Sequence, residues 1–263
     1  MTEKLTLDKG GQRERQVRGD GSIRRFFREL SWLTKSDSRL YWLYRLTGRS
    51  FTDYYAARMD RIAKEAPQSA TGRPQQKRFQ MEYLIDQGMQ PDSHLLDFGC
   101  GTGSAAVSLV DYLDSDRYLG ADISEHCVEL ARQRMVDEQL FHKNARFVHL
   151  DDQADRVIEG TFDFIWAQSV LTHVPPVEMA GLLRSLAPLL RESGRFYATF
   201  AFTDGKPVHY RYKDWFYHPS FFDEVCEGLP IDCRIMTDWR HPNAPIDRMV
   251  CFTPAPATQG VAA

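Results

Sequence analysis

The 263-residue sequence has no strong excess of either charge. Its 33 lysines and arginines stand against 36 aspartates and glutamates, which gives a net charge of −3 and an isoelectric point near 6.2. A surface built to attract nucleic acid usually carries a clear positive excess. We therefore do not expect nucleic acid as a partner.

Long apolar runs are also missing from the sequence. No stretch approaches the ~20 apolar residues of a membrane span, and the first residues, Met-Thr-Glu-Lys, are polar and unlike an apolar signal region. We expect a cytoplasmic protein that has no membrane partner.

The cysteines form neither a C-x-x-C pair nor another common zinc pattern, and the acidic residues form no recognisable motif for a divalent metal. We therefore expect no metal site, and five reduced thiols in the core or in turns. The five are Cys100, Cys127, Cys226, Cys233 and Cys251.

Apolar residues make up 43% of the chain, which is enough for one sizeable domain with an appendage. The first residues are polar and rich in arginine and glycine, a composition typical of disorder. We divide the chain into a disordered tail (1–21), a helical cap or lid (22–90), an α/β domain (91–253) and a flexible tail (254–263).

Aromatic residues at three- and four-residue steps predict two or three short helices between residues 23 and 66, broken near Ser36 and Gly48. Another helix is predicted over 75–87. The aromatic density exceeds what packing of a helix on a sheet requires. It favours a cap over an active site, although aromatic packing alone would give the same pattern.

The stretch from His94 to Ser104 organises the rest of the chain. It predicts a buried strand over 94–98, a turn containing Gly99, Gly101 and Gly103, and then a helix. The spacing departs from the dinucleotide fingerprint G-x-G-x-x-G, because Ser104 stands where the third glycine would be. A strand, a glycine turn and a helix in this order form a unit that holds a ligand.

Two acidic residues indicate which ligand this is. Asp97, two residues before Gly99, would repel a pyrophosphate but suits an ammonium group. Asp122 ends the next predicted strand, 118–122, where a carboxylate can bind both hydroxyls of a ribose. S-adenosylmethionine combines these features, since it is a nucleoside without phosphates that carries a sulfonium and an amino-acid end.

Strands and helices alternate through the remainder of the domain. This pattern predicts a doubly wound, seven-stranded, mostly parallel sheet whose last strand returns antiparallel. Further strands are predicted over 146–150, 162–167, 195–202, 231–236 and 248–253, and helices over 105–113, from Ser124 onward, over 177–190 and over 219–228.

The run Leu96-Asp97-Phe98-Gly99-Cys100-Gly101-Thr102-Gly103 resembles the first motif, Leu-Asp-x-Gly-x-Gly-x-Gly, of the class I S-adenosylmethionine-dependent methyltransferases. The resemblance covers roughly Asp92 to Phe252. It implies a Rossmann-like methyltransferase fold and S-adenosylmethionine as the cofactor. It further implies that the cofactor is bound by Asp97, Gly99, Cys100, Gly101, Gly103, Asp122, Ile123, Asp151, Asp152 and Gln168.

His173 follows the fourth predicted strand, which in this family faces the methyl group. A histidine there can take the proton of an alcohol as the methyl group moves. The alternative interpretation is that His173 only shapes the cofactor pocket. His241 and His209 are reserve candidates for the base, because both lie in predicted loops on the substrate side.

The segment 204–218 is unusually aromatic and basic. Because it follows the fifth predicted strand, we interpret it as a wall or lid of the active site. His209, Tyr210, Tyr212 and Trp215 are the candidates for stacking on a sugar or a planar ring, and Lys206, Arg211 and Lys213 for meeting an acidic group.

The function we expect is O-methylation of a small molecule, at a hydroxyl of a glycan or a secondary metabolite. A methyltransferase acting on protein or tRNA is the second hypothesis, favoured only by the basic N-terminal end. A third is a binding protein without catalytic activity, against which the intact Asp97, Asp122 and glycines argue. The acceptor, the methylated atom, a metal requirement of the reaction and the oligomeric state stay open.

Overall fold

The computed structural model describes residues 36–66, 74, 77–150, 158–242, 244 and 247–256. The predicted tail 1–21, the helical residues expected before Ser36, and Asp151 and Asp152 lie outside these ranges. Most of the predicted tail 254–263 lies outside them as well. Residues 40–263 form one compact unit, and only four described residues belong to the other unit, 1–39.

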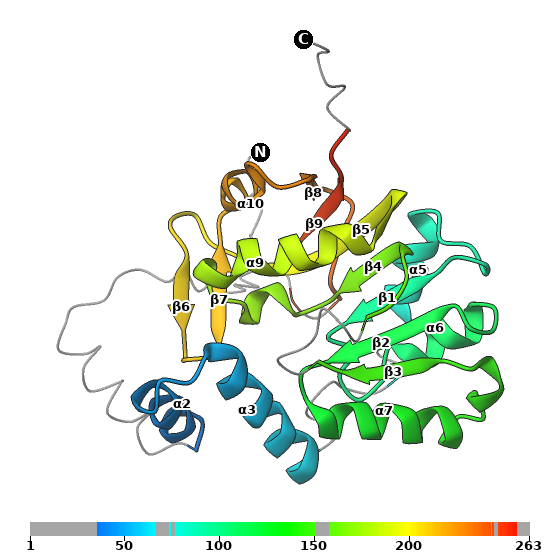
Figure 1. Ribbon diagram of the computed structural model, residues 1–263, viewed down its shortest axis with the longest axis horizontal. Helices are drawn as coiled ribbons and strands as arrows, with labels where there is room; N and C mark the ends of the chain where they lie inside the picture. The colour runs from blue at the N-terminus through cyan, green and yellow to red at the C-terminus, as the bar shows by residue number, and fades with distance from the viewer. Residues whose placement is uncertain are drawn as a thin grey trace, which may run out of the picture. The chain divides into compact units, whose positions relative to one another are not determined.

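One mixed sheet of nine strands organises the described residues. Its parallel centre has the order β3-β2-β1-β4-β5, and β9 pairs antiparallel with β5 and with β8 (Figure 1). The strands are β1 Leu95–Phe98, β2 Tyr118–Asp122, β3 Arg146–His149, β4 Phe162–Ala167, β5 Leu190–Phe202, β6 Val208–Tyr210, β7 Asp214–Tyr217, β8 Ile231–Met236 and β9 Asp247–Pro254.

The doubly wound, mostly parallel sheet is confirmed, and all seven predicted strands are present within a few residues. The two additional strands, β6 and β7, form a hairpin within the aromatic segment 204–218. β7 extends the sheet because it pairs with the last residues of β5, Ala201 and Phe202. The polar and aromatic composition of this segment has no clear two-residue alternation, so the sequence did not predict strands there.

The predicted helix 177–190 is too long at its C-terminal end. The α-helix α9 covers Pro176–Leu186, a 3₁₀ turn follows over Ala187–Leu189, and β5 already begins at Leu190. Pro188 has no amide hydrogen and therefore cannot continue the helical hydrogen-bond pattern. A bulge between Phe162 and Phe164 lets the early part of β5 pair with β4.

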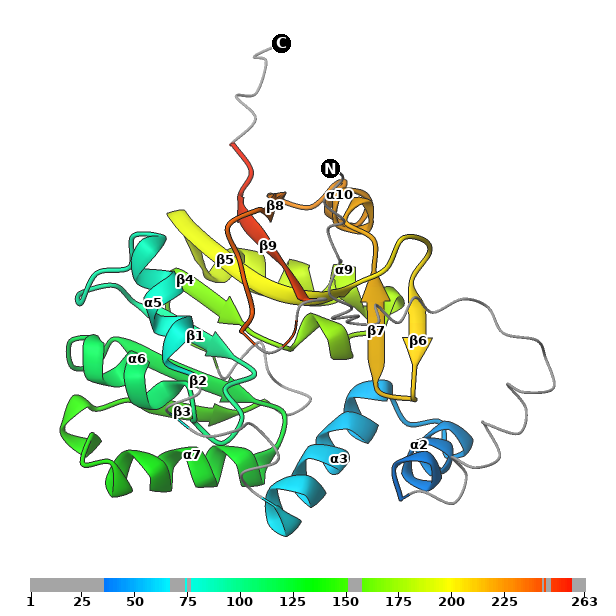
Figure 2. The same cartoon turned by 180° about the vertical axis from the view of Figure 1, so that it is seen from behind.

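Helices cover both faces of the sheet, because successive side chains of the central strands point to opposite sides. Trp166 and Tyr197 pack in one core with α5, α6 and α7, whereas Ile165 and Phe196 pack in the other with α9 and α10. Figure 1 shows α9 in front of the sheet, and Figure 2 shows α5 in front of the opposite face. These helices are α5 Arg78–Asp86, α6 Ala106–Tyr112, α7 Glu125–Asp137 and α10 Ser220–Cys226, and short 3₁₀ turns cover Phe141–Lys143 and Leu171–His173.

Two helices precede the sheet, α2 Ser36–Leu46 and α3 Phe51–Glu65. The predicted break near Gly48 is confirmed by these boundaries, whereas the break predicted near Ser36 stays a prediction, because the residues before Ser36 lie outside the described ranges. Ser50 and Asp53 form a capping box that fixes the start of α3, because each side chain accepts the backbone N–H of the other residue. None of the described helices is long and apolar enough to cross a membrane. All five cysteines are free thiols.

Candidate active site

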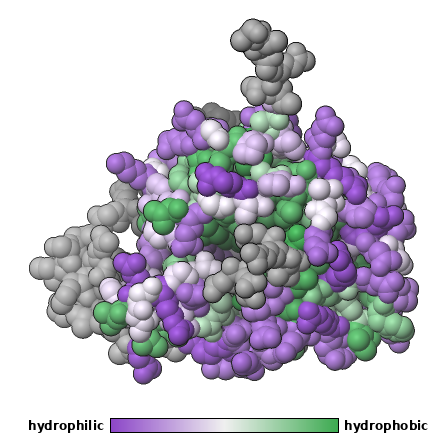
Figure 3. Space-filling view, viewed as in Figure 1, coloured by the Kyte–Doolittle hydropathy of each residue, from purple (hydrophilic) through white to green (hydrophobic). Residues whose placement is uncertain are grey.

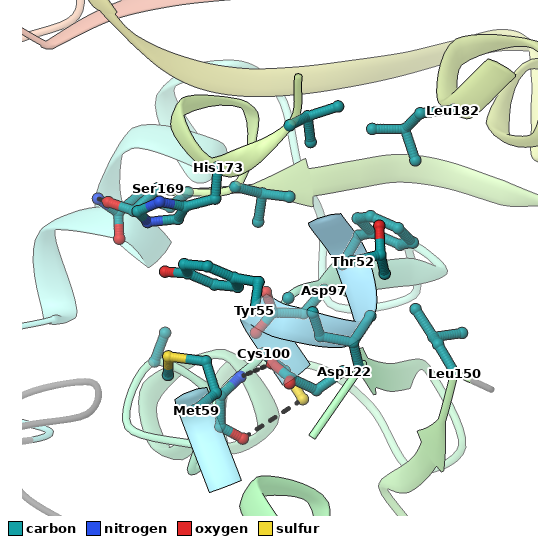
Figure 4. A pocket seen from close by; sticks show the side chains of 18 of the residues that line it. Thr52, Tyr55, Met59, Asp97, Cys100, Asp122, Leu150, Ser169, His173 and Leu182 are labelled. Atoms are coloured by element: carbon teal, nitrogen blue, oxygen red, sulfur yellow. Dashed lines mark hydrogen bonds between the residues drawn. The ribbon is translucent and has the colours of Figure 1, made fainter. Parts of the chain in front are cut away.

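A cavity of about 900 Å³ lies at the carboxyl ends of β1, β2 and β4, with α3 and α5 forming further walls (Figure 4). Nine of the residues predicted for the site line it: Asp97, Gly99, Cys100, Gly101, Asp122, Ile123, Gln168, His173 and His241. The adjacent ends of parallel strands therefore bring together residues that are distant in the sequence, as expected for this type of sheet.

Asp122 is buried at the end of β2 with both of its oxygens hydrogen-bonded to the backbone. The N–H of Gly101 donates to Oδ2 at 2.8 Å, and the N–H of Ser124 donates to Oδ1 at 2.9 Å. Burial raises the pKa of Asp122, and these two N–H groups counter the rise. Each oxygen keeps a second lone pair, so the carboxylate is fixed in place and can still accept hydrogen bonds from a ligand.

Asp97 is the second buried carboxylate of the cavity, with 3% of its surface exposed. The hydroxyl of Tyr118 donates to its Oδ2 at 2.6 Å. Burial, with a smaller contribution from the charge of Asp122, raises the pKa of Asp97 to about 7, although the Tyr118 hydroxyl acts in the opposite direction. A cationic ligand beside Asp97 would favour its ionised form.

Gly99 and Gly103 of the glycine turn leave room for different neighbouring residues. A Cβ at Gly99 (φ +79°) would collide with Cγ2 of Val170, whereas one at Gly103 (φ +72°) would lie 3.0 Å from Cβ of Ala131 in α7. Gly103 does not line the cavity. Its position is explained by the close approach of α7, so the structure connects it to helix packing.

The loop after β4 is held by a chain of amide hydrogen bonds. Trp166 donates through Nε1 to Oε1 of Gln80 at 2.8 Å, and Gln80 donates through Nε2 to Oε1 of Gln168 at 3.1 Å. The backbone N–H of Ser169, which has φ +61°, donates to Oγ1 of Thr199. Gln80 was not predicted as a site residue, because its only signal in the sequence is a polar residue on the inward face of α5.

His173 lies on the cavity wall with its ring fixed from behind. Its Nδ1 is 2.9 Å from the backbone oxygen of Lys213 and 3.3 Å from Oδ1 of Asp214. A carbonyl oxygen only accepts, so Nδ1 carries the proton and Nε2 keeps its lone pair in the neutral ring. His173 was predicted from the sequence as a site residue and Asp214 was not, because the two residues meet only through the hairpin.

Asp214 is itself held by Lys213, whose Nζ lies 2.7 Å from Oδ1 and 2.5 Å from Oδ2. Burial opposes ionisation of Asp214, but the hydrogen bonds and charges of His173 and Lys213 outweigh it and hold the pKa below its ordinary value. Asp214 is therefore a carboxylate at neutral pH. It places a negative charge behind the imidazole of His173.

Tyr55 of α3 covers His173 from the cavity side. The two rings stack with centroids 4.4 Å apart and planes 24° apart. Figure 4 shows the phenol ring across the cavity, between His173 and the residues Cys100 and Met59. Burial raises the pKa of Tyr55, so its hydroxyl stays protonated at neutral pH. Tyr55 was not singled out from the sequence as a site residue.

His241 lines the same cavity from the loop between β8 and β9. Burial and the nearby charge of Lys77 lower its pKa, which favours a neutral ring. Its ring meets Phe79 edge to face, with centroids 5.2 Å apart. The structure thus brings both predicted histidines, His173 and His241, to one cavity.

The four aromatic residues predicted to bind substrate do not line this cavity. His209 stacks on Trp215 with ring centroids 4.3 Å apart. The ring centroid of Tyr212 lies 5.0 Å from that of Tyr41 in α2. They and Tyr210 belong to the hairpin β6–β7, which supports the cavity from outside through Lys213 and Asp214. Direct contact between these four residues and a substrate stays a prediction.

Comparison with known proteins agrees with this geometry. Residues 95–194 match the model of a family described as a methyltransferase domain. Relatives include the sterol 24-C-methyltransferase erg6 of Aspergillus fumigatus, 28% identical over 49% of this chain and 35% of the relative, and an O-methyltransferase of Pyrenophora dematioidea, 28% identical over 50% and 48%. Magnesium protoporphyrin IX methyltransferase from Synechocystis PCC 6803, solved with bound S-adenosylhomocysteine, has the same fold (TM-score 0.60, 16% identity, 78% of this chain, 100% of that chain).

Residues 95–194 therefore form a methyltransferase domain, and the sheet has the fold of the class I S-adenosylmethionine-dependent methyltransferases. Solved structures of this fold hold S-adenosylmethionine or S-adenosylhomocysteine, in agreement with the cofactor predicted from the sequence. The chain spans less than half the length of the two curated relatives named above.

The cavity of this methyltransferase suits that cofactor. The free lone pairs of Asp122 match the two hydroxyls of a ribose, and the buried carboxylate of Asp97 matches an ammonium group. The cofactor supplies a methyl group made electrophilic by a positively charged sulfur. Among the described residues, no group of three or more His, Cys, Asp or Glu side chains is arranged to hold a metal ion.

Proposed function

We propose that this methyltransferase transfers a methyl group to an oxygen of a small molecule, at a hydroxyl of a glycan or a secondary metabolite. The observation that carries the proposal is the hydrogen bond from Nδ1 of His173 to the backbone oxygen of Lys213. It leaves Nε2 as a proton acceptor on the wall of the cavity. An alcohol needs such a group, because it must lose a proton when its oxygen is methylated.

The proposed reaction is an in-line displacement. A lone pair of the acceptor oxygen forms the new bond to the methyl carbon, and the pair of the breaking carbon–sulfur bond stays on sulfur. Nε2 of His173 takes the hydroxyl proton, and the resulting imidazolium is stabilised by the carboxylate of Asp214. The residues of the protein therefore orient the acceptor and move one proton.

The shape of the site supports a small acceptor. A second cavity of about 780 Å³ adjoins the first and shares Phe98, Ile123 and Leu182 with it. Figure 3 shows hydrophobic residues at the floor of a hollow between α9 and α3. Pockets of this size and apolar character are typical of small-molecule sites.

The relatives support methyl transfer but differ in the atom they methylate. The Pyrenophora relative is named an O-methyltransferase, and the Aspergillus relative is named for methylation at carbon 24 of a sterol. The support for oxygen therefore comes from the geometry of His173 and not from the relatives.

We further propose that the helical segment before the sheet, predicted as 22–90, acts as a cap. Five residues of α3 line the cavity, and one of them, Thr52, donates to Oε2 of Glu178 in α9 at 3.2 Å. The hydroxyl of Ser124 donates to Oδ1 of Asp60 at 2.5 Å, so α3 is also tied to the loop that follows Asp122. The residues of α3 that line the cavity beside Thr52 are Tyr55, Arg58, Met59 and Ile62.

The test is a turnover assay with S-adenosylmethionine and pooled acceptors of defined class. The readout is the mass increase of the acceptor, about 14 Da for each hydrogen replaced by a methyl group. We expect methylated alcohols or phenols, and formation of S-adenosylhomocysteine that requires the acceptor. Methylation of amines or of protein alone, in the same pools, would contradict the proposal.

A further inference from the structure

Lys77 is a cation in the cavity wall that no other described residue neutralises by direct contact. It precedes α5, lines the cavity and is partly buried. Its ammonium group makes no hydrogen bond to a described residue, and no described carboxylate oxygen lies within the 4.0 Å that defines an ion pair. A partly buried charge without a partner is costly, so this position calls for an anion from a ligand.

Other cations of the cavity are already engaged. Lys213 bonds both oxygens of Asp214, and the guanidinium of Arg58 lies 5.7 Å from the centre of the Tyr55 ring. Lys77 is thus the cavity-lining cation of the described chain that is most available to a negatively charged ligand.

Asp97 and Lys77 line the same cavity and are close enough for their charges to interact, but they form no ion pair. The charge of Asp97 raises the pKa of Lys77 against the larger lowering by burial, and the charge of Lys77 acts in turn on Asp97. Asp247 of β9 acts on Lys77 in the same direction, also from beyond ion-pair distance. A carboxylate and an ammonium that are close but separated match a zwitterion placed between them, with each of its charges toward the opposite charge.

We propose that Lys77 binds the α-carboxylate of the cofactor's amino-acid end, whose ammonium group faces Asp97. The two protein charges would then fix the direction of the amino-acid end, while Asp122 fixes the ribose. The inference depends on the cofactor of the family and not on the acceptor, so failure of the proposed O-methylation would leave it intact.

The test measures binding of three adenosine ligands to the full chain by calorimetry. S-adenosylhomocysteine carries both charges of the amino-acid end, its decarboxylated analogue keeps only the ammonium, and 5′-methylthioadenosine lacks both. Lys77→Met should weaken the binding of S-adenosylhomocysteine about 10- to 100-fold and leave the affinities for the other two ligands unchanged. Lys77→Arg, which keeps the charge, should restore most of the affinity.

Two further variants sharpen the test. Asp97→Asn should weaken the binding of both S-adenosylhomocysteine and the decarboxylated analogue, because both carry the ammonium group. It should leave the affinity for 5′-methylthioadenosine unchanged. Arg78→Met is the matched control, since Arg78 follows Lys77 directly but is exposed and paired with Glu82. It should change none of the three affinities.

Unchanged binding of S-adenosylhomocysteine to Lys77→Met would overturn the proposal. An equal loss for S-adenosylhomocysteine and its decarboxylated analogue would also overturn it, because Lys77 would then not distinguish the carboxylate. Binding of 5′-methylthioadenosine reports on the fold of the pocket, so equal weakening of all three ligands would assign Lys77 a structural role and contradict carboxylate binding.

Discussion

At one end of the cavity, Asp97 and Asp122 stand at the ends of neighbouring strands, and backbone N–H groups of the adjoining turns hold Asp122 in place. At the other end, Tyr55, His173 and Asp214 come from a helix before the sheet, the loop after β4 and a hairpin after β5. The first end, which we call the cofactor end, is assembled from two consecutive strands and the turns that follow them. The second, which we call the acceptor end after its proposed role, exists only where three segments distant in the sequence meet.

This difference indicates how each end should respond to change. Backbone hydrogen bonds position the cofactor end, so a substitution there removes one contact and leaves the rest in place. Side chains position one another at the acceptor end, so a substitution there also displaces its neighbours. The following experiments compare the two ends, from the largest expected effect to the smallest.

His173→Ala should lower the single-turnover rate by about 10² to 10⁴ and leave the affinity for S-adenosylhomocysteine nearly unchanged. The reason is that His173 is proposed to move a proton and not to hold the cofactor. His142→Ala, at an exposed histidine outside the cavity, is the control. If His173→Ala weakened cofactor binding and kept its turnover at saturating cofactor, His173 would belong to the cofactor end.

The ligand-free protein should lose stability as the pH rises, because the buried carboxyl group of Asp97 then ionises. The pKa of this carboxyl is raised from 3.8 to about 7 in the folded state, so the folded protein binds more protons than the unfolded chain between these values. Stability therefore falls in this interval, by about 2 to 3 kcal/mol from roughly pH 5 to pH 8 for this group. Asp247, with a pKa raised to about 6 by burial, adds to the fall.

Denaturant unfolding of the wild type and of Asp97→Asn, measured across this pH range, isolates the contribution of Asp97. The amide is neutral at every pH and still accepts from Tyr118, so its stability should vary less with pH. Parallel pH profiles of the two proteins would contradict the raised pKa.

Asp122→Ala should weaken the binding of S-adenosylhomocysteine about 10- to 100-fold, because two charge-assisted contacts to the ribose are lost. Turnover at saturating cofactor should fall much less than in His173→Ala. Calorimetry and single-turnover kinetics on the same preparation provide both numbers. A loss of turnover without a loss of affinity would place Asp122 outside the ribose site.

Asp214→Asn should reduce turnover about tenfold and leave cofactor affinity unchanged. The carboxylate stabilises the protonated ring of His173, so without it the acid limb of the pH–rate profile should move to lower pH. Glu192→Gln, at an exposed acid early in β5, is the control. A tenfold loss with an unmoved pH profile would indicate that Asp214 acts only by holding the hairpin.

The smallest expected effect is slower hydrogen exchange of the amides in α3, by about a few-fold, when S-adenosylhomocysteine binds. The hydrogen bonds from Ser124 to Asp60 and from Thr52 to Glu178 connect α3 to both sides of the cavity. The hairpin β6–β7 does not line the cavity except through Lys213, so its exchange should change less. Equal exchange in α3 with and without ligand would argue against the cap.

The sequence determined the parts of this protein that depend on local patterns. The seven strands, the N-cap at Ser124, and the positions of Asp97 and Asp122 were predicted because strand periodicity, capping residues and glycine turns are short-range signals. The family motif extends over contiguous residues for the same reason, so it predicted the cofactor as well.

Only the tertiary structure decided which side chains meet at the acceptor end. Nothing in the sequence near His173 points to Asp214 or Tyr55, because their contacts depend on the pairing of β7 with the end of β5 and on the position of α3. The same holds for Lys77, which comes near Asp97 only after α5 packs on the sheet. Such contacts follow from long-range packing, where hydrophobic burial sets the positions of the elements and polar side chains find their partners afterwards.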